Sequence, residues 1–227
     1  MTSGAPRATI NGAMDATRHY DRAYFDDQRT SGEFGGRAEL VKFEEFVRPG
    51  DAVLDFGCGG GFLLANLKCS DRMGVEVNPA ARAACAAIGM PVVASLDEVP
   101  DGWADVAIIN HALEHVVDPH SQLTKLRSKL KPGGKLVLCV PCERYDTEYD
   151  PEDYDKHLFT WSPMNAGNLV TVCGFRVVEA RLFRHKFPPG YRQLQRFLGW
   201  PTLHLSARLW GRLQRKMTQV RVVATKN

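Results

Sequence analysis

The sequence has no apolar run of the length that a membrane-spanning helix needs. No stretch of about 18 consecutive apolar residues occurs in the 227-residue chain, so we expect no transmembrane helix. Residues 1–18 are polar and rich in small side chains, and they lack the apolar segment of a secretory signal. They predict a flexible N-terminal tail, followed by a single domain over residues 19–227.

Cysteine is too scattered to build a disulfide framework. The six cysteines lie at positions 58, 69, 85, 139, 142 and 173, which favours reduced thiols and a cytoplasmic protein. Cys139 and Cys142 form one C-x-x-C pair at the end of a predicted strand. Because no second pair at zinc-site spacing accompanies it, we interpret this pair as a coincidence of composition.

Acidic residues are absent from the C-terminal fifth of the chain. Eleven basic residues and no Asp or Glu occur over residues 181–227, whereas the preceding 180 residues carry 18 basic and 26 acidic side chains, a net charge of −8. The C-terminal segment is therefore cationic and the rest of the chain anionic. This division predicts an anionic partner or an internal docking surface for the C-terminal segment.

Predicted strands and helices alternate through most of the chain. Apolar runs predict strands over 52–56, 73–77, 91–94, 104–110, 135–140, 175–182 and 219–224. Helical spacing and capping residues predict helices over 38–47, 62–68, 79–89, 119–130 and 162–174. The pattern is typical of an α/β, Rossmann-like, doubly wound sheet of seven strands, mainly parallel, with an antiparallel last strand and a helical insert before it.

A glycine-rich loop follows the first predicted strand. The strand ends in Asp55, and glycines then recur at every second position, at Gly57, Gly59 and Gly61. Glycine permits positive φ and lets backbone approach a ligand closely. The dinucleotide fingerprint G-x-G-x-x-G would require glycine at position 62, where Phe62 stands.

An acidic residue marks the end of the second predicted strand. Glu76 lies 21 residues after Asp55, the place from which a carboxylate can accept hydrogen bonds from two ribose hydroxyls. This geometry serves NAD and an adenosine ligand equally. Glu76 therefore predicts a ribose and leaves the identity of the ligand open.

Three further motifs follow the Asp55 glycine loop and Glu76 along the chain: Ala104-Asp105-Val106, His111-Ala112-Leu113-Glu114-His115-Val116 and Leu130-Lys131-Pro132-Gly133-Gly134. In this order and spacing, the five motifs resemble the class I S-adenosylmethionine-dependent methyltransferases, near the small-molecule branch that includes the ubiquinone-pathway O-methyltransferases. The resemblance runs from about Glu39 to Phe175. It implies S-adenosylmethionine as the cofactor.

The resemblance also assigns the cofactor contacts. It implies that the loop touches the methionine part of the cofactor, through Asp55, Gly57, Cys58, Gly59 and Gly61. By the same likeness, Glu76 holds the ribose and Val77 packs on the adenine. Asn110 and His111 lie near the methionine moiety, and Arg37 pairs with the cofactor carboxylate. Many relatives have an acid where Ser95 stands, so the adenine amino group would here be bound by Ser95 or by the backbone of Leu96.

Methyl transfer to a hydroxyl needs a base, because the acceptor loses its proton as the new bond forms. His157 lies in the predicted acceptor-site loop over residues 143–161, where the resembled family often carries a histidine. We therefore predict His157 as the general base, with His111 as the second candidate. A structural loop histidine is the alternative for His157.

Six acidic residues crowd the same loop: Asp146, Glu148, Asp150, Glu152, Asp153 and Asp155. We interpret them as a solvated lid or as a partner for the cationic C-terminal segment. The alternative is a Mg²⁺ site that organises a sugar diol and uses these acids together with His115 or Glu143.

The last predicted strand is preceded by a basic helical insert over residues 184–217. Leu205, Leu209, Leu213 and Met217 form an apolar stripe beside Trp210, and basic residues fill the other side. The default interpretation is a helix that packs its stripe on the domain and caps the acceptor pocket. The alternatives are that this helix contacts an anionic membrane surface peripherally or that it binds an RNA backbone.

The sequence therefore predicts an O-methyltransferase with a small-molecule or glycan acceptor. The preference for a sugar rests on the likeness of residues 20–27, Tyr-Asp-Arg-Ala-Tyr-Phe-Asp-Asp, to openings seen among glycan-pathway methyltransferases. Two alternatives remain. One is an RNA methyltransferase that uses the cationic segment, although the Asn/Asp-Pro-Pro-Tyr type of motif is missing. The other is a catalytically silent module that binds S-adenosylmethionine.

Overall fold

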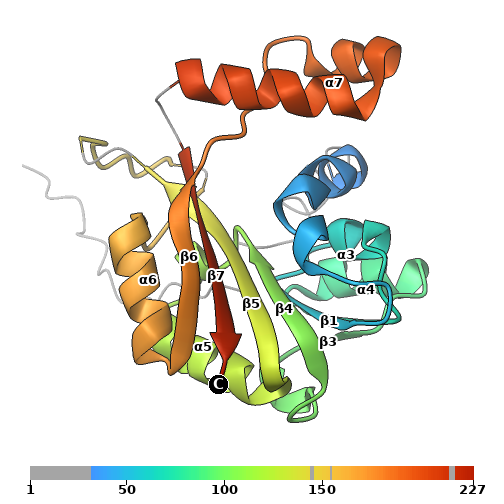
Figure 1. Ribbon diagram of the computed structural model, residues 1–227, viewed down its shortest axis with the longest axis vertical. Coiled ribbons are helices and arrows are strands. Elements are labelled where there is room, and N and C mark those ends of the chain that lie inside the picture. Colours follow the sequence, from blue (N-terminus) through green and yellow to red (C-terminus); the bar gives the residue numbers. More distant parts are fainter. Residues whose placement is uncertain (1–31, 144–145, 154, 215–217) are drawn as a thin grey trace, which may run out of the picture.

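A computed structural model describes residues 32–143, 146–153, 155–214 and 218–227 (Figure 1). The predicted tail over residues 1–18 and the sugar-related likeness of residues 20–27 lie outside the described residues. The domain prediction for residues 19–31 also lies outside them.

Seven strands form one sheet, as the sequence predicts. The strands are β1 (Ala52–Phe56), β2 (Asp71–Val75), β3 (Val92–Val93), β4 (Ala104–Asn110), β5 (Leu130–Cys142), β6 (Phe175–Phe183) and β7 (Thr218–Lys226). Their order across the sheet is β3-β2-β1-β4-β5-β7-β6. The pairs from β3 to β5 are parallel, and β7 is antiparallel to both β5 and β6. The predicted fold class, including the antiparallel last strand, is confirmed.

Helices cover both faces of the sheet (Figure 1). One face packs against α3 (Phe62–Asn66) and α4 (Pro79–Ala87), and the other packs against α5 (Pro119–Lys129) and α6 (Pro163–Val172). Each face has its own cluster of buried apolar side chains, with Leu64 and Cys85 in one and Leu123 and Val170 in the other. The apolar strands can be covered on both faces only in this three-layer arrangement, which explains their continuous apolar runs.

Two helix starts follow from capping residues. Asn78 accepts a hydrogen bond from the backbone N–H of Ala80 at 2.8 Å and so caps α4, which has proline at its first position. Ser162 forms a capping box with Asn165 at the start of α6. These caps set the first residues of α4, just after β2, and of α6, after the loop that follows β5.

The structure corrects several predicted boundaries. The helix expected over residues 38–47 is a helix over residues 32–38 followed by two 3-10 segments, η1 (Glu39–Lys42) and η2 (Glu44–Phe46). β5 begins at Leu130 and therefore runs through Pro132, Gly133 and Gly134, which the sequence predicts as the break between the helix over residues 119–130 and the strand over residues 135–140. Gly32 and Gly36 explain the first difference, since a Cβ on either would lie within 2.6 Å of Phe62 atoms, and only glycine lets this helix sit so close to α3.

The basic insert contains α7 (Tyr191–Leu213), which is kinked at Gly199. Its predicted packing face is wrong. Leu203, Ala207 and Gly211 are buried, whereas Leu205, Leu209 and Leu213 of the predicted stripe are exposed, and Met217 lies outside the described residues. Small residues form the packing face because α7 lies close to the chain after β6: a Cβ on Gly211 would meet the carbonyl carbon of Arg184 at 3.0 Å. Among the described residues, no helix combines the length and apolar character needed to cross a membrane.

Candidate functional site

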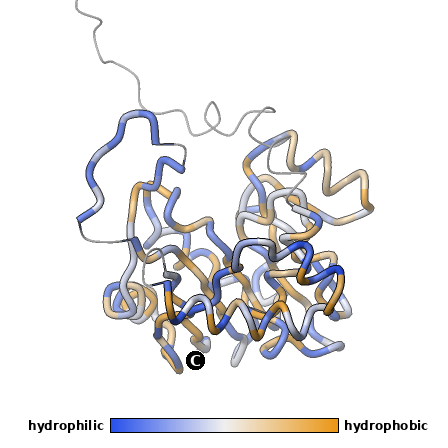
Figure 2. Tube along the Cα trace, turned by 90° about the horizontal axis from the view of Figure 1, so that it is seen from above, coloured by the Kyte–Doolittle hydropathy of each residue, from blue (hydrophilic) through white to orange (hydrophobic). Residues whose placement is uncertain are grey.

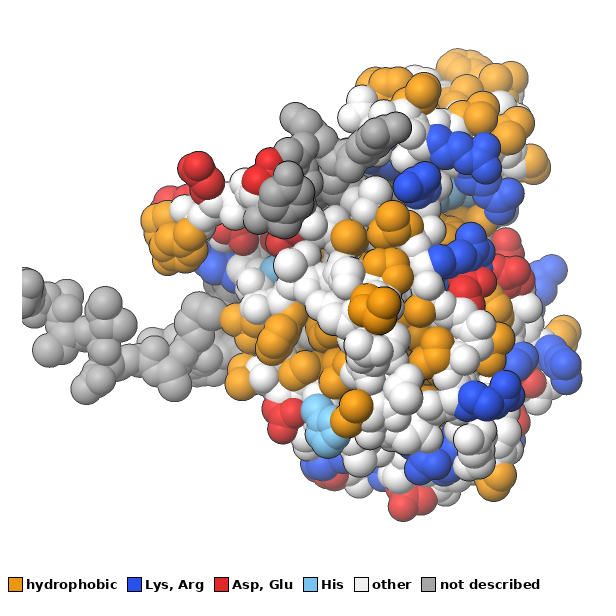
Figure 3. All heavy atoms as spheres, turned by 60° about the vertical axis from the view of Figure 1, so that its left-hand side comes forward, with side chains coloured by type: hydrophobic (Ala, Val, Ile, Leu, Met, Phe, Trp, Pro, Cys, Tyr) orange, Lys and Arg blue, Asp and Glu red, His pale blue; other side chains and the backbone are white. Residues whose placement is uncertain are grey.

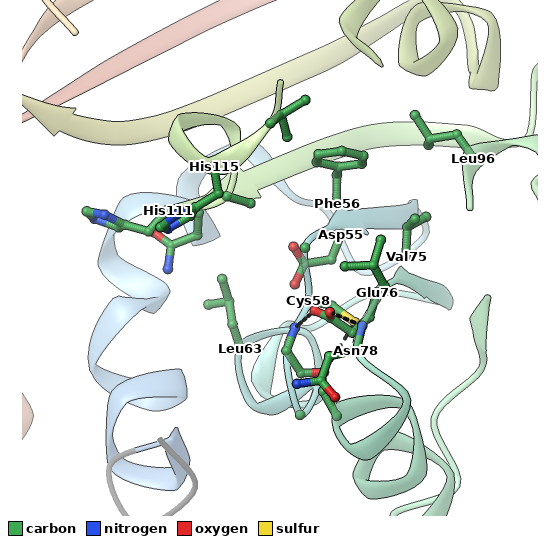
Figure 4. Close-up of a pocket in the computed structure, with 18 of the residues that line it drawn as sticks. Asp55, Phe56, Cys58, Leu63, Val75, Glu76, Asn78, Leu96, His111 and His115 are labelled. Carbon is green, nitrogen blue, oxygen red and sulfur yellow. Dashed lines mark hydrogen bonds between the residues drawn. The ribbon is translucent and has the colours of Figure 1, made fainter. Parts of the chain in front are cut away.

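A cavity of about 740 Å³ opens at the carboxyl ends of β1, β2 and β4 (Figure 4). This is the edge at which ligands bind in sheets of this kind. Figure 4 shows His111 and His115 on one side of the cavity and Leu96 on the other, with Asp55 and Glu76 between them. The sequence-predicted cofactor residues other than Arg37 and Gly61 line this single cavity.

The glycine loop is held in a shape that only glycine adopts without strain. Gly57 and Gly59 have φ of 75° and 53°, and the backbone N–H of Gly57 donates to the carbonyl of Val75 at 2.8 Å. A Cβ on Gly57 would lie 2.4 Å from the Cβ of Ala112, whereas a Cβ on Gly59 would meet nothing within 4 Å. Gly57 therefore serves close packing against the loop after β4, and Gly59 exposes backbone at the cavity.

Glu76 links the glycine loop to the end of β2. One carboxylate oxygen accepts the N–H of Gly59 at 2.9 Å, and the other accepts the N–H of Asn78 at 2.8 Å. These two bonds fix the orientation of the carboxylate at the cavity wall. A carboxylate oxygen can accept more than one hydrogen bond, so Glu76 can hold vicinal hydroxyls while it keeps both backbone partners.

Asp55 is buried at the base of the cavity beside Glu76. Burial, and then the negative charge of Glu76, raise the pKa of Asp55 to about 8. Its Oδ1 atom accepts no hydrogen bond within the described part of the chain. A buried carboxylate oxygen without a donor is costly, and it fits a site that a cationic or hydrogen-bonding ligand completes.

Cys58 lies in the glycine loop but is not poised for chemistry. Its hydrogen bond with Cys85 and its burial raise the pKa of the Cys58 thiol. The two sulfurs are 4.0 Å apart, and the Cys85 thiol also donates to the carbonyl of Gly59 at 3.2 Å. Since the thiolate is the reactive form, Cys58 acts here as a packing residue of the loop.

The far wall of the cavity suits a flat apolar group. Val77 is exposed on one side, and Leu96 is buried in η3 (Leu96–Glu98) on the other. The hydroxyl of Ser95 already accepts the backbone N–H of Asp97 at 3.0 Å, as part of a capping box with Glu98. Ser95 therefore has a structural role at the start of η3 in addition to its place at the cavity.

The opposite end of the cavity contains polar groups from the end of β4. Asn110 accepts a hydrogen bond from the Lys42 ammonium at 3.2 Å. His111 has φ of 52°, an unusual value for a residue with a side chain, and such backbone strain gathers at functional sites. Its Nδ1 atom lies 3.4 Å from the carboxylate of Glu114.

Sequence reasoning missed a buried ion pair behind this end of the cavity. Lys42 is fully buried and pairs with Glu39, which lines the cavity. Burial opposes both charges, but the pairing outweighs it: the pKa of Lys42 is raised and that of Glu39 is lowered. The spacing of three residues between the two was the only available signal, and it is common on any helix.

Arg37 does not lie at the cavity. Its side chain is exposed, and its guanidinium lies 5.2 Å from the ring centre of Trp200, which tethers the helix over residues 32–38 to α7. The resemblance-based role of Arg37 with a cofactor carboxylate therefore has no support from its position.

His157 forms a hydrogen-bonded pair with Glu143. The Nδ1 atom of His157 contacts a carboxylate oxygen of Glu143, and the ring lies 4.9 Å from that of His115, which lines the cavity. The backbone carbonyl of Glu114 accepts the N–H of Leu158 at 2.9 Å and so holds the two loops together. His157 itself stands behind His115 and does not line the cavity.

Within the described residues, the group Glu114, His115 and His157 brings three metal-binding side chains together, with ligand atoms within 4.8 Å of one another. Two imidazoles are not the ligands that Mg²⁺ prefers. The described acids of residues 146–155 are exposed and form no such group. Figure 2 shows this stretch as a hydrophilic loop that projects from the body. The predicted Mg²⁺ site in this loop therefore has no support from the geometry.

Comparison with known proteins adds to this picture. A family model described as "Methyltransferase domain" matches residues 32–180. A ribosomal protein L11 methyltransferase of Burkholderia cenocepacia is 32% identical over 108 residues, which are 42% of this chain and 33% of that protein. The matched region thus spans about a third of the length of the curated relatives.

Solved structures share the fold at low identity. A SAM-dependent methyltransferase from Archaeoglobus fulgidus superposes with a TM-score of 0.64 and 20% identity, over 91% of this chain and 100% of that one. Phosphoethanolamine N-methyltransferase 2 of Haemonchus contortus, in complex with S-adenosyl-L-methionine, gives 0.65 and 13%, over 95% of this chain and 60% of that one. At these identities the likeness shows the fold alone.

Proposed function

The chain belongs to the methyltransferase domain family, and we propose that it transfers the methyl group of S-adenosylmethionine to a hydroxyl of a small-molecule or glycan acceptor. The observation that supports the choice of oxygen is the Glu143–His157 pair, which stands behind the cavity wall formed by His115. An oxygen acceptor needs a group that removes its proton, and a carboxylate-oriented imidazole is suited to this.

The cavity fits the cofactor. Glu76 can hold the ribose hydroxyls, and Val77 and Leu96 can enclose the adenine. The cationic methionine part would favour the ionised form of Asp55, whose Oδ1 has no donor among the described residues, and Glu39 adds negative charge there. Gly59 offers backbone at close approach. When bound, S-adenosylmethionine supplies an electrophilic methyl group whose transfer leaves neutral S-adenosylhomocysteine.

His157 takes the acceptor proton in this proposal. Glu143 accepts the Nδ1–H of His157, which leaves Nε2 with a lone pair and stabilises the imidazolium that forms. Burial lowers the pKa of His115, so this ring is neutral at pH 7 and can pass or position a proton between the cavity and His157. His111 is the alternative base, since it lies directly at the cavity.

Position supplies the rest of the rate enhancement. In-line displacement needs the acceptor oxygen within about 3 Å of the methyl carbon and aligned with the bond that breaks. The strained His111 and the buried Lys42–Glu39 pair hold the end of β4 and the first helical segments around that place. The loop over residues 143–161 and the insert over residues 184–217 would shape the acceptor side.

A second candidate has support from the curated relatives. The match to ribosomal protein L11 methyltransferases raises a protein acceptor as the alternative, with an amine of that protein as one target to test, and the cationic C-terminal segment keeps RNA as a further alternative. A general base matters less for an amine acceptor, because a neutral amine already has a lone pair that can attack the methyl group and the site only has to bind the amine in this neutral form.

The experiment is a methyl-transfer assay that measures S-adenosylhomocysteine release with panels of sugars, phenols, peptides and short RNAs. We expect turnover with a hydroxyl acceptor, and loss of that turnover in His157→Gln, with His120→Gln at an exposed position of α5 as the matched control. Turnover confined to amine acceptors, or full hydroxyl turnover in His157→Gln, would overturn the proposal. No turnover despite cofactor binding would indicate a catalytically silent module.

A further inference from the structure

α7 exposes its large apolar side chains and buries its small ones. The buried face is formed by Leu203, Ala207 and Gly211, and Leu205 follows two residues after Leu203, about 200° around the helix. Leu205, Leu209 and Leu213 are 60%, 52% and 75% exposed. A helix whose only role was to cover the domain would have the opposite arrangement.

The exposed apolar residues of the described chain are concentrated on this helix. Of the 14 large apolar side chains that are exposed among the described residues, five belong to α7. They are the three leucines named above together with Phe197 and Leu198, which lie beside the kink at Gly199. Grouped exposed apolar side chains mark an interaction surface rather than ordinary surface scatter.

Basic residues flank the leucines, and acidic residues are missing. α7 carries Arg192, Arg196, Arg208 and Arg212, which are all exposed, and no Asp or Glu occurs from residue 181 to the C-terminus. Figure 3 shows hydrophobic and basic side chains side by side on the lobe that α7 forms at the top of the molecule. Arginines beside an apolar stripe match the boundary between anionic headgroups and acyl chains.

We propose that α7 is a membrane-surface helix that binds anionic lipid bilayers with Leu205, Leu209 and Leu213 toward the acyl chains and its arginines toward the headgroups. A second copy of this chain fits the surface less well, because a symmetric α7–α7 contact would bring Arg208 and Arg212 of both copies together without an acid on either helix. The helix lies on the surface, since no described helix can cross a bilayer.

The anchoring of α7 connects this surface to the cavity. Trp200 packs against Phe34 with ring centres 5.1 Å apart, and the helix over residues 32–38 that carries Phe34 also lines the cavity through Gly35 and Gly36. When α7 is bound to lipid, the cavity would therefore lie close to the bilayer, connected to α7 through the helix over residues 32–38. The inference stands independently of methyl transfer, because lipid binding can be measured without turnover.

The test is co-sedimentation of the whole protein with vesicles of pure phosphatidylcholine and of phosphatidylcholine with about 30% phosphatidylglycerol. We expect binding to the anionic vesicles that weakens at high salt and is absent for the neutral ones. Leu205→Gln/Leu209→Gln and Arg208→Gln/Arg212→Gln should each bind roughly tenfold more weakly. Met164→Gln/Val172→Gln on α6 (73% and 71% exposed) and Arg48→Gln/Arg176→Gln are matched controls that should bind like wild type.

Folding is checked separately, by thermal unfolding and by the stabilisation that S-adenosylhomocysteine gives. Variants that keep both and lose vesicle binding would support the proposal. Wild-type protein that stays in the supernatant with anionic vesicles would overturn it. So would a dimer in solution that Leu205→Gln/Leu209→Gln dissociates, or retention of a short RNA by the same arginines without vesicle binding.

Discussion

The imidazole of His157 is hydrogen-bonded through Nδ1 to the carboxylate of Glu143, and its ring lies against His115 at the cavity wall. The two residues lie at opposite ends of one loop, since Glu143 directly follows β5 and His157 comes shortly before α6. In the mechanism that we propose, Glu143 is a positioning residue and Nε2 of His157 is the atom that accepts a proton.

The first prediction concerns this pair. With a hydroxyl acceptor, His157→Gln should lower kcat by about 10²- to 10⁴-fold, the usual contribution of a general base, with the KM for S-adenosylmethionine unchanged. Glu143→Gln should lower kcat by roughly tenfold, because the imidazole loses its fixed orientation. Glu143→Asp should recover part of that loss. A change in KM for the cofactor with kcat unaltered would assign both residues to binding instead.

The second prediction concerns the pH dependence of stability. The pKa of Asp55 is about 8 in the folded chain because of burial and the charge of Glu76, and about 3.9 in an unfolded chain. Unfolding therefore releases a proton between about pH 4 and 8, and stability falls as the pH rises through this window. Asp55→Asn should unfold at a higher temperature than wild type at pH 8.5, with a smaller difference at pH 5. Equal differences at both values would contradict the buried, protonated carboxyl.

The same carboxyl predicts proton release on cofactor binding. A cationic ligand beside Asp55 favours its ionised form, so binding at pH 7 should release a proton and tighten as the pH rises to about 8. Calorimetry in two buffers of different ionisation enthalpy measures the proton directly. Asp55→Asn should abolish the release, and a proton count of zero for wild type would refute it.

The fourth prediction separates two glycines. Gly59→Ala adds strain at positive φ without a clash and should lower the free energy of unfolding by about 1–2 kcal/mol. Gly57→Ala should cost about 1–3 kcal/mol more, because the new Cβ meets that of Ala112 at 2.4 Å. Ala112→Gly in the Gly57→Ala background should restore much of this additional loss. Chemical denaturation of the four proteins tests the pair, and the absence of any rescue would show that the contact is not the cause.

The fifth prediction concerns metals. Dialysis against a strong chelator should leave methyl transfer unchanged. The described acids of residues 146–155 are exposed and do not form a metal-binding group, and two of the three side chains in the group Glu114, His115 and His157 are imidazoles, which Mg²⁺ does not prefer. Activity that chelation removes and Mg²⁺ or Mn²⁺ restores would require a metal in the acceptor site and a different role for His157.

The alternation of apolar runs with helical segments was sufficient to predict the fold class, since such strands need helices on both faces. The meeting of Asp55, the glycine loop and Glu76 at one cavity could also be predicted, because these motifs follow successive strands and the carboxyl ends of parallel strands lie at the same edge of the sheet. Local patterns of this kind survive folding with little change.

Features that depend on long-range packing could not be read from the sequence. The buried pairing of Lys42 with Glu39 depends on how closely residues 32–46 approach β4. The position of Arg37 outside the cavity depends on its contact with Trp200, which is far away in the sequence. The outward orientation of Leu205, Leu209 and Leu213 follows from the close approach of Gly211 to Arg184, which periodicity cannot show. An apolar stripe predicts an interface, but not which face of the helix is already occupied.

The most direct test of the account is thermal unfolding with S-adenosylhomocysteine, with NAD and without ligand, for wild type, Glu76→Ala and the exposed control Glu44→Ala. A ligand at about 100 times its dissociation constant adds about 2.7 kcal/mol, or roughly 5–10 °C for a chain of this size. We predict this shift with S-adenosylhomocysteine alone, kept in Glu44→Ala and lost in Glu76→Ala. A shift with NAD instead, or an S-adenosylhomocysteine shift that survives in Glu76→Ala, would contradict the assignment of the cavity.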